Sequence, residues 1–432
     1  MSTCFYLKKR FAYFIMLLAI CLCSTARCVT HKKAQPHAII GKTSPIYLVA
    51  REPSKAQIYQ ISPDDGSSSI VYEIAEGIDR PVGDVFPPSE IKKLQSYLVV
   101  HSSSVTTTMD SIFSNPYIER LTLSPTGEML AWIEGDTYCV DGSAICFGVK
   151  RLMVLDLNTN TARNLLQIPS HSDEDFIYYI SGGPTWSPDG QYIAIIRSAK
   201  DVPSEALLIV TNVSTEQRRE TMGTIDSGAP LVWAPDKSTL AWKLSRWHTR
   251  SSGGAIRLCV FQTDECKDIE FDGLWIWNWS MDWSPDGEWI VFAAKQKDSD
   301  VFSSDARIGL HLLDPRTGLI QDIPVNVGGM LENPRWSPDG QLLAADYRSR
   351  ADNFFQSLLV IEPTSGQVVS QLSTQRAVSS WAWGDDSHSI LVLTGTDRTQ
   401  LEVGILDVRT GSLQNVMLPD ELATKQINYL DW

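Results

Sequence analysis

The chain has 432 residues, of which 43% are hydrophobic and 20% charged, and this composition excludes an intrinsically disordered protein. Its 51 acidic residues outnumber its 37 basic ones, and the net charge of −14 excludes general binding to nucleic acid or to an anionic membrane surface. The length alone suggests about three domains, but closed all-β folds often exceed the usual domain size, so internal repeats have to be sought first.

The first 26 residues have the pattern of a secretory signal peptide. Three basic residues at 8–10 precede an apolar run over 11–22, and small residues follow where signal peptidase requires them. The run is short for a membrane span. We therefore predict a signal peptide over 1–26, export to the periplasm, the cell envelope or the medium, and a mobile tail over 27–44. No integral membrane span is predicted after cleavage; a retained anchor and a lipoprotein attached through Cys28 are the alternatives.

Three apolar segments follow the tail and are predicted as β-strands: 46–50, 57–61 and 69–74. The sequence Pro-Asp-Asp-Gly separates the last two and is typical of a turn. We predict that 76–117 is an elaborated connection from these strands to the next unit, with a short helix around 89–97.

A unit of about 50 residues then recurs along the chain. Each copy has an apolar strand ending in Trp or Leu, a turn of the Ser-Pro-Asp-Gly type, and a second apolar strand. Asp-Gly between two β-rich runs favours a hairpin, because the turn needs residues that tolerate positive φ. The strand-ending positions are Leu123, Trp186, Trp233, Trp283, Trp336 and Trp383, and their spacings of 63, 47, 50, 53 and 47 are those of four-stranded propeller blades.

A second turn, of the Asp-x-x-Thr-Gly type, closes each unit between its third and fourth strands. The N-terminal unit lacks a first strand, whereas the last apolar segment, 427–432, lacks the other three. We therefore predict an all-β fold: a seven-bladed β-propeller of four-stranded blades over 45–432, with the ring closed by pairing of the C-terminal strand with the N-terminal blade.

Four cysteines fall into two equally spaced pairs, Cys139/Cys146 and Cys259/Cys266, each seven positions apart. This spacing suits a disulfide across a local hairpin or loop. A zinc site is the alternative, but neither pair has the CxxC spacing or a flanking His. We predict two disulfides and no metal.

The string Trp-Ser-Pro-Asp-Gly is complete at 186–190, 283–287 and 336–340 and resembles the TolB-type propeller repeat. It is also similar to the propeller part of dipeptidyl peptidase and prolyl oligopeptidase-like enzymes. The resemblance covers 45–432 and implies an exported propeller that binds something, most commonly a protein partner. The repeat is specific for the fold and says almost nothing about function. Neither the separate N-terminal domain of TolB nor the catalytic α/β-hydrolase domain of the peptidases is expected here.

The sequence contains no G-x-S-x-G nucleophile elbow, no HExxH and no EF-hand loop. Gly41-Lys42-Thr43 imitates the end of a phosphate-binding loop, but position 36 is Pro instead of Gly. Aspartates recur in the first turn of the units at Asp189, Asp236, Asp286 and Asp339, where bonding to the local backbone explains them better than acid–base or metal chemistry. We predict no catalytic residue and no cofactor.

Because successive strands alternate in direction, the short turns share one face of the propeller and the long, varied connections share the other. The long-loop face is where function is expected. A set of basic residues lies at or just after the second strand of each unit: Arg51, Arg197, Lys200, Arg246, Arg250, Lys295, Lys297, Arg348, Arg350 and Arg398. Such a ring would attract an anionic ligand, although charged residues also cap strand ends and protect edges.

Aromatic residues on the same face offer a second means of binding. Trp275, Trp277 and Trp279 alternate along one strand, so all three share a face on which they either bind a ligand or pack between blades. An acidic loop at 173–175 beside His171 suits either calcium or solvent.

The candidate ligand-binding residues are Arg197, Arg246, Trp247, His248, Trp275, Trp277, Arg348 and Arg350. We predict an exported, non-catalytic binding module or scaffold that engages a protein partner or an anionic glycan on its long-loop face. The alternative is a propeller enzyme acting on polysaccharide, as a lyase, a glycoside-active protein or a metal-dependent variant of either. Only His171 and His248 map to that face, so a set of three His ligands cannot be assembled there.

Overall fold

The computed structural model describes the chain from residue 44 onward with gaps: 44–52, 55–75, 112–140, 146–169, 178–199, 206–222, 230–244, 254–296, 308–349, 356–372, 377–395, 401–418, 422 and 426–431. The elements within these ranges are β-strands, and the predicted all-β class is confirmed. The predicted signal peptide, tail and short helix lie outside the described residues.

The strands form five sheets of four strands and one of eight, in which consecutive strands pair antiparallel. The sheet that joins the two ends of the chain contains β28 (Gln426–Asp431), β1 (Ile46–Glu52), β2 (Lys55–Ile61) and β3 (Ser68–Ala75). The second sheet contains β4 (Ile112–Leu123), β5 (Met129–Val140), β6 (Cys146–Asp156) and β7 (Thr161–Pro169). The third contains β8 (Tyr178–Trp186), β9 (Tyr192–Ala199), β10 (Leu207–Asn212) and β11 (Arg218–Met222). The fourth contains β12 (Leu231–Trp233), β13 (Thr239–Lys243), β14 (Ala255–Val260) and β15 (Glu265–Glu270).

The eight-stranded sheet consists of two antiparallel runs of four strands. They are β16 (Leu274–Trp283), β17 (Ile290–Gln296), β18 (Ile308–Leu313) and β19 (Ile320–Asp322); and β20 (Gly329–Trp336), β21 (Leu343–Ser349), β22 (Gln356–Ile361) and β23 (Val368–Gln371). A single parallel pair, Ile308 with Met330, joins the runs. The last sheet contains β24 (Ala377–Trp383), β25 (Ser389–Gly395), β26 (Leu401–Asp407) and β27 (Ser412–Asn415).

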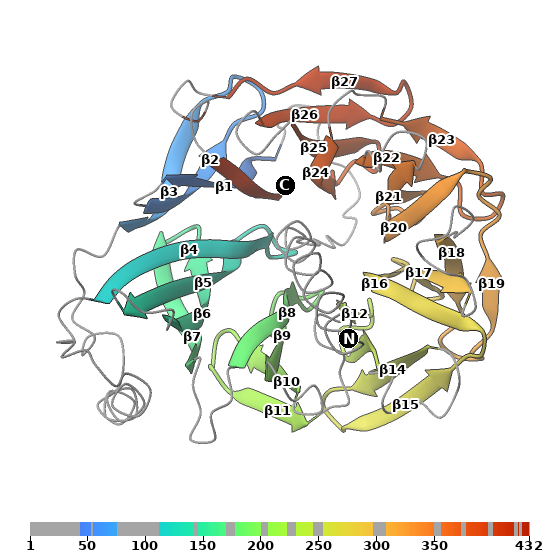
Figure 1. Cartoon of the computed structure of the whole chain (residues 1–432), viewed down its shortest axis with the longest axis horizontal. Coiled ribbons are helices and arrows are strands. Elements are labelled where there is room, and N and C mark those ends of the chain that lie inside the picture. Colours follow the sequence, from blue (N-terminus) through green and yellow to red (C-terminus); the bar gives the residue numbers. More distant parts are fainter. Residues whose placement is uncertain are drawn as a thin grey trace, which may run out of the picture.

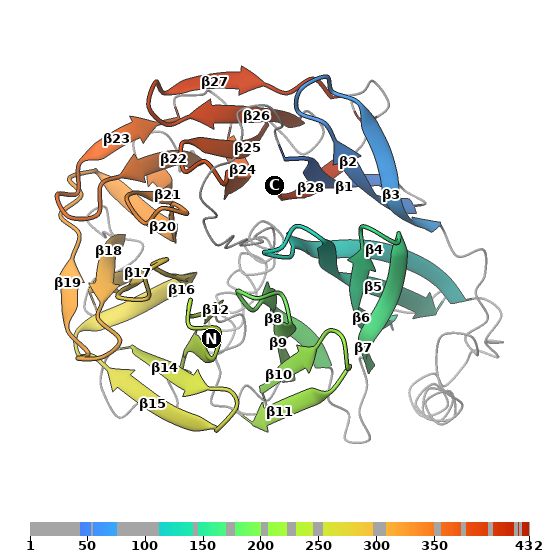
Figure 2. The ribbon, with the colours of Figure 1, turned by 180° about the vertical axis from the view of Figure 1, so that it is seen from behind.

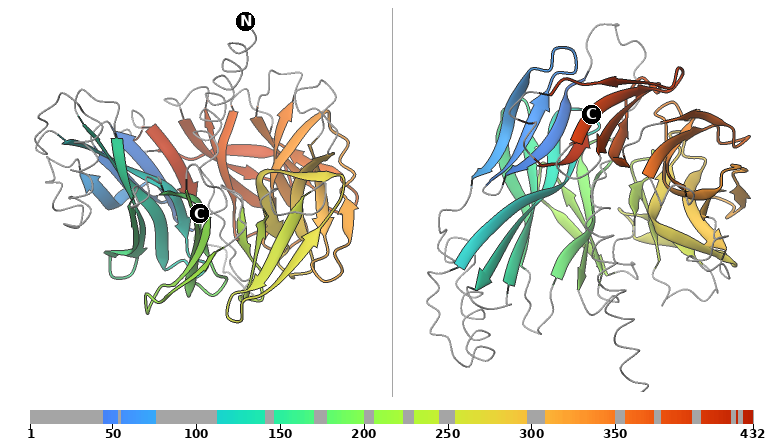
Figure 3. Two further views of the ribbon diagram at one scale, coloured as in Figure 1. Left: turned by 60° about the horizontal axis from the view of Figure 1, so that its bottom comes forward. Right: turned by 45° about the horizontal axis from the view of Figure 1, so that its top comes forward.

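The sheets are arranged around a common centre, as in a β-propeller. In both face-on views the first strand of each sheet lies nearest the centre and the fourth lies at the outer rim (Figure 1 and Figure 2). The tilted views show the strands running from one face of the disc toward the other (Figure 3). The first-to-second and third-to-fourth turns therefore share one face, which we call the short-turn face, and the other end of the strands is the long-loop face.

The last strand of the chain pairs with the first. β28 lies antiparallel to β1 and matches Tyr47 with Asp431, Leu48 with Leu430 and Arg51 with Gln426. The N-terminal sheet thus takes its inner strand from the C-terminal end of the sequence, as the unpaired segment 427–432 predicts. The inner strand β4 begins at Ile112, within the segment predicted as a connection, because it pairs along the whole length of β5.

The central strands are buried on both faces because each sheet packs between two neighbours. Isoleucines 193, 195 and 196 of β9 are fully buried, as are Ala194 and the apolar residues of β25. Such strands have nearly continuous apolar sequences instead of strict alternation. Outer strands differ: along β15, five of the six residues are exposed. The core therefore consists of the layers between sheets.

The recurring turn sequence folds each inner hairpin in the same way. In the copy at 187–190, the Ser187 hydroxyl donates to Asp189 Oδ1 (2.6 Å) and accepts from the backbone N–H of Tyr192 (2.9 Å). Gly190 has φ of 71°, which favours glycine. The same bonds recur at Ser284 and Ser337, while Asp236 accepts from the N–H groups of Ser238 and Thr239. The predicted turn role of the four aspartates is confirmed.

Three of the tryptophans that end inner strands connect their sheet to the sheet before it. The indole Nε1–H of Trp186 donates to the Thr122 carbonyl (3.4 Å), and that of Trp233 donates to the Thr185 carbonyl (3.3 Å). The contact recurs from Trp383 to the carbonyl of Arg335 (3.3 Å). All three acceptors immediately precede the strand-ending residue of the previous unit, so the predicted packing role of these rings is confirmed.

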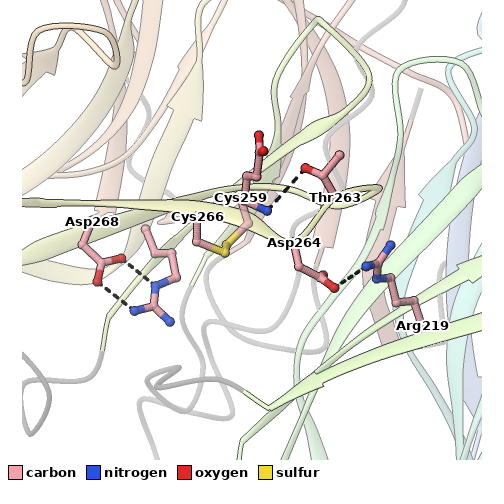
Figure 4. The surroundings of a disulfide bond; sticks show 8 residues. Arg219, Cys259, Thr263, Asp264, Cys266 and Asp268 are labelled. Carbon is pink, nitrogen blue, oxygen red and sulfur yellow. Dashed lines mark hydrogen bonds and ion pairs between the residues drawn. A yellow bond between two sulfur atoms is a disulfide. The ribbon is translucent and has the colours of Figure 1, made fainter.

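Basic side chains on the outer strands make a second contact between neighbouring sheets. Arg219 of β11 donates to the Gln262 carbonyl (2.8 Å) and pairs with Asp264 (Figure 4). Lys267 of β15 likewise donates to the Arg316 carbonyl (2.8 Å) in the next sheet. The outer rim is therefore held by cations that satisfy turn carbonyls.

One of the two predicted disulfides is present. Cys259 and Cys266 are opposite one another on β14 and β15 and are covalently joined, as Figure 4 shows. The backbone pairs Cys139 with Cys146 on β5 and β6 in the same way, but their side chains lie outside the described residues.

Replacing both Cys259 and Cys266 by Ser is expected to lower the melting temperature by several degrees. The loop-entropy model gives a bridge of this span roughly 2.5 kcal/mol of stabilisation, less any strain. Thermal unfolding followed by circular dichroism, with and without a thiol reductant, measures the change. The Cys139→Ser, Cys146→Ser variant keeps the Cys259–Cys266 bridge, so the reductant should still lower its melting temperature. If the Cys259, Cys266 variant melts at the same temperature as the unreduced wild-type protein, the bridge has no stabilising role.

Candidate functional site

The candidate site lies at the long-loop end of the eight-stranded sheet, where four neighbouring strands bring aromatic and charged residues together. Trp275 and Trp277 are near the beginning of β16, Lys295 is near the end of β17, and Arg348 is near the end of β21. These positions face the long connections because the short turns lie at the other end of the same strands. We call Trp275, Trp277, Lys295, Glu332 and Arg348 the Trp–Arg site.

A buried carboxylate ties two members of this site together. Glu332 of β20 accepts a hydrogen bond from the indole Nε1–H of Trp277 at 2.7 Å and pairs with Arg348 Nε at 3.4 Å. The Glu332 side chain is 6% exposed, whereas that of Arg348 is 32% exposed. The carboxylate therefore orients one aromatic ring and one guanidinium, each from a different strand, at the edge of solvent.

The second ring of the site lies beside a lysine. Trp275 and Lys295 are directly opposite one another on β16 and β17, and the Lys295 ammonium lies 5.9 Å from the centre of the indole ring. This distance is within the range of a cation–π interaction. Both Trp275 and Trp277 are half-buried, so they combine packing against the sheet with an accessible surface.

A fully buried aspartate lies directly opposite Glu332 on the neighbouring strand. Asp346 of β21, opposite Glu332 in the pairing of β20 with β21, accepts a hydrogen bond from Trp381 Nε1 at 2.7 Å and another from the Asn333 amide. Trp381 belongs to β24 of the following sheet. This bond therefore fixes the position of β21 relative to the next sheet, and with it the position of Arg348.

A comparable carboxylate joins two other sheets. Glu134 of β5 is buried and accepts from the hydroxyl of Tyr72 on β3 (2.9 Å), and it pairs with Arg151 on β6 (3.1 Å). The ring of Tyr72 also lies 4.6 Å from that of Trp132. Buried acids with aromatic and arginine partners thus occur at two places in the fold.

The structure brings together some of the predicted site residues. Trp277 and Arg348 meet at Glu332, and Trp275 is next to Trp277 on β16. Arg197 lies in β9 of another sheet, paired in register with Ile180 and Leu207. The other predicted residues, Arg246, Trp247, His248 and Arg350, lie outside the described residues, as do the acidic loop and its His171.

Sequence reasoning missed Glu332 and Asp346. Asp346 lies within β21, which continues to Ser349, because the residues from Asp346 to Arg348 pair on both sides with β20 and β22. The only signal in the sequence is an acidic residue within an otherwise apolar strand, next to a Trp-rich neighbour.

The turn carboxylates of the short-turn face have a structural role. Asp407 accepts from the backbone N–H groups of Thr410 (3.0 Å) and Arg409 (2.9 Å), and these bonds, the one from Thr410 first, lower the pKa of Asp407. At the equivalent turn, bonds from the Ser365 side chain and from the N–H groups of Ser365 and Thr364 lower the pKa of Glu362 to about 2. These acids are ionised at neutral pH and are occupied by their own turns.

Two further findings concern the described residues only. No group of three or more His, Cys, Asp or Glu side chains within them is placed to hold a metal ion. No helix in the same ranges is long and apolar enough to cross a bilayer.

Neither a protein-family model nor a curated protein matches the chain. Solved structures do match it. An oligogalacturonate lyase from Vibrio parahaemolyticus is 13% identical, with 89% of this chain and 90% of that chain covered and a TM-score of 0.53. A prolyl endopeptidase is 12% identical, with a TM-score of 0.52, and the match spans 91% of this chain but half of the endopeptidase. TolB from Acinetobacter baumannii is 12% identical, with 89% and 82% covered and a TM-score of 0.42.

At these identities the likeness concerns the fold alone. The predicted resemblance to prolyl peptidases is confirmed at that level by the match to the prolyl endopeptidase.

Proposed function

We propose that this protein is an exported, non-catalytic binding module, and that the Trp–Arg site is part of the surface by which it engages a protein partner. The observation that carries the proposal is the orientation of Trp277 and Arg348 by the buried Glu332. Tryptophan and arginine are the residues that most often dominate binding energy at protein interfaces, particularly when their positions are fixed beforehand. The signal-peptide pattern of residues 1–26 supports export.

The scaffold in this proposal is a ring of seven blades. Five four-stranded sheets and the two four-stranded runs of the eight-stranded sheet supply the blades, and the pairing of β28 with β1 closes the ring. A closed ring is rigid, and rigid scaffolds are suited to presenting residues from different strands at fixed distances.

The chemistry of the site favours a partner with acidic and apolar side chains. The contact with Glu332 uses Nε of Arg348, and guanidinium groups also bind carboxylates through their terminal nitrogens. Lys295 adds a second positive charge beside Trp275. An anionic glycan would present similar groups to these residues and is the other ligand class that the site suits.

The test is an affinity capture from an envelope extract of the source organism, in which the wild-type protein is compared with the variant Trp275→Ala, Arg348→Gln. Glutamine at 348 removes the charge but keeps a hydrogen-bond donor for Glu332. We expect the wild-type protein to capture at least one protein from the extract, and the variant to capture at least tenfold less of it.

The matched control for this test is Arg316→Gln. Arg316 also pairs with a carboxylate through Nε, with Asp314 at 3.5 Å, but it lies on the short-turn face. Equal capture by the site variant and by wild type would reject this site as the binding surface. If the Arg316→Gln control also captures less of the partner, the loss of capture is caused by the change in total charge.

A second candidate function is cleavage of polysaccharide. Its support is the similarity to oligogalacturonate lyase, which extends over most of both chains. Incubation with oligogalacturonate, with and without a divalent cation, would reveal unsaturated products by their ultraviolet absorbance. Turnover that is lost with the site variant would replace the non-catalytic proposal by the enzymatic one.

A further inference from the structure

Arg120, on the inner strand β4, has an unusual backbone conformation. Its φ is +59°, and a break in the pairing of β4 with β5 lies between Glu119 and Thr122. Equivalent positions, three residues before the strand-ending residue, are occupied by Gly183 (φ +76°) in β8 and Asn333 (φ +52°) in β20. The three residues thus share one left-handed bulge of the inner strands.

Arginine is a poor choice for this conformation. Glycine enters the left-handed region freely and asparagine is tolerated there, whereas a long side chain incurs a penalty of order 1 kcal/mol. Non-glycine residues with such strain concentrate at functional sites, where the side chain is needed. The glycine and the asparagine at the other two positions follow backbone preference, so the side chain at Arg120 is the exception that needs a separate reason.

The guanidinium of Arg120 lies between two innermost strands. Its Nη1–H donates to the carbonyl of Gly183 on β8 at 3.1 Å, and both β4 and β8 border the centre of the ring (Figure 1). The side chain is partly exposed, but its Nε is buried and has no hydrogen-bond partner among the described residues. A buried donor without an acceptor is unfavourable, by roughly 1–3 kcal/mol.

The nearby carboxylates are already paired with other cations. Glu119, the preceding residue, pairs with Lys150, and Glu134 pairs with Arg151. Within the ranges that the structure describes, Arg120 has an ion pair with neither. Its charge is permanent because arginine stays protonated at every physiological pH. The sheet therefore presents one positive charge that its own acids do not neutralise.

We propose that Arg120 binds an oxyanion, a carboxylate or a phosphate, at the inner wall of the ring between β4 and β8. The planar guanidinium can match two oxygens of either group through its terminal nitrogens. The site lies on different sheets from the Trp–Arg site and does not depend on the function proposed for it.

The experiment measures binding of inorganic phosphate and of acetate by calorimetry, at constant ionic strength maintained with chloride. The test variant is Arg120→Asn, because asparagine occupies the equivalent bulge at 333 and keeps the backbone conformation. We expect the wild type to bind at least one of the two anions, and the variant to bind it at least tenfold more weakly. Which anion binds identifies the source as a carboxylate or a phosphate.

The matched control is Arg219→Gln, which removes an arginine that also donates to a carbonyl of the neighbouring sheet but has Asp264 as its partner. It should bind the anion as the wild type does. No binding to the wild type, or equal binding to wild type and Arg120→Asn, would overturn the proposal, as would equal weakening by the control.

If Arg120→Asn does not fold, a second variant, Arg120→Lys, keeps the charge and tests whether the two-pronged contact of the guanidinium is needed. Binding intermediate between wild type and no binding is expected, because an ammonium cannot contact two oxygens in the same plane. Unchanged affinity would reject the guanidinium geometry. Arg348→Gln should leave anion binding at Arg120 intact. A failure of this proposal can therefore be distinguished from a failure of the proposed function.

Discussion

A chain that lacks residues 426–432 is expected to lose its cooperative thermal unfolding transition near the wild-type temperature. The deletion removes β28 and leaves the inner edge of β1 without its neighbour. Tyr47, Leu48 and Val49, each at most 3% exposed, would lose their cover from that side. Each lost backbone hydrogen bond contributes about 1 kcal/mol, and the total stability of a typical protein is only about 5–15 kcal/mol.

Thermal unfolding followed by circular dichroism measures this effect directly. A synthetic peptide of the sequence 426–432, added in excess to the shortened chain, should restore part of the transition, because it supplies the same strand. A peptide with Ile427 replaced by Pro is the matched control, since proline cannot donate the hydrogen bond of a strand. A shortened chain that melts like the full one would contradict the stabilising role of the pairing between the two ends.

Replacing Asp346 by Ala is expected to destabilise the protein by roughly 3 kcal/mol or more. The carboxylate is fully buried and accepts from the Trp381 indole and from the Asn333 amide. Its removal would take this acceptor from the buried Trp381 indole and from the half-buried Asn333 amide, and an unsatisfied buried donor costs about 1–3 kcal/mol. The midpoint of chemical denaturation, compared with the wild type at an unchanged slope, measures the loss.

A double-mutant cycle separates this bond from the effect of lost volume. Trp381→Phe removes only the donor, and the combination with Asp346→Ala should destabilise by less than the sum of the two single changes. Asp346→Asn, which keeps one acceptor oxygen, should be milder than Asp346→Ala. Strict additivity of the two single changes would show that the Asp346–Trp381 bond does not contribute to the position of β21.

The repeat made most of the fold predictable. The turn string needs Ser, Asp and Gly at fixed places for reasons of local bonding, so it identifies hairpins directly, and the apolar strands around it have to be buried on both faces. The unpaired segment at the end of the chain predicted the partner of β1 by the same logic. The length of β4 was not predictable, because it depends on the extension of its neighbour β5 and not on its own composition.

The candidate site was less predictable. Trp277 and Arg348 were recognisable as an aromatic and a cation at strand ends, but the residue that joins them, Glu332, belongs to a different strand and has no distinguishing motif. The role of Glu332 depends on Arg348 and Trp277, which are 16 and 55 positions away in the sequence. Spacing within a repeat cannot reveal such contacts, since each unit has its own side chains at these positions.

The hydrogen bond from a strand-ending tryptophan to the sheet before it has a direction. The unit that begins with β8 has both halves of this contact: Trp186 donates to the Thr122 carbonyl, and the Thr185 carbonyl accepts from Trp233. The acceptor is main chain and survives any substitution. A gene segment encoding this unit therefore carries both a donor and an acceptor, so in a tandem duplicate the indole of the second copy would meet the backbone carbonyl of the first.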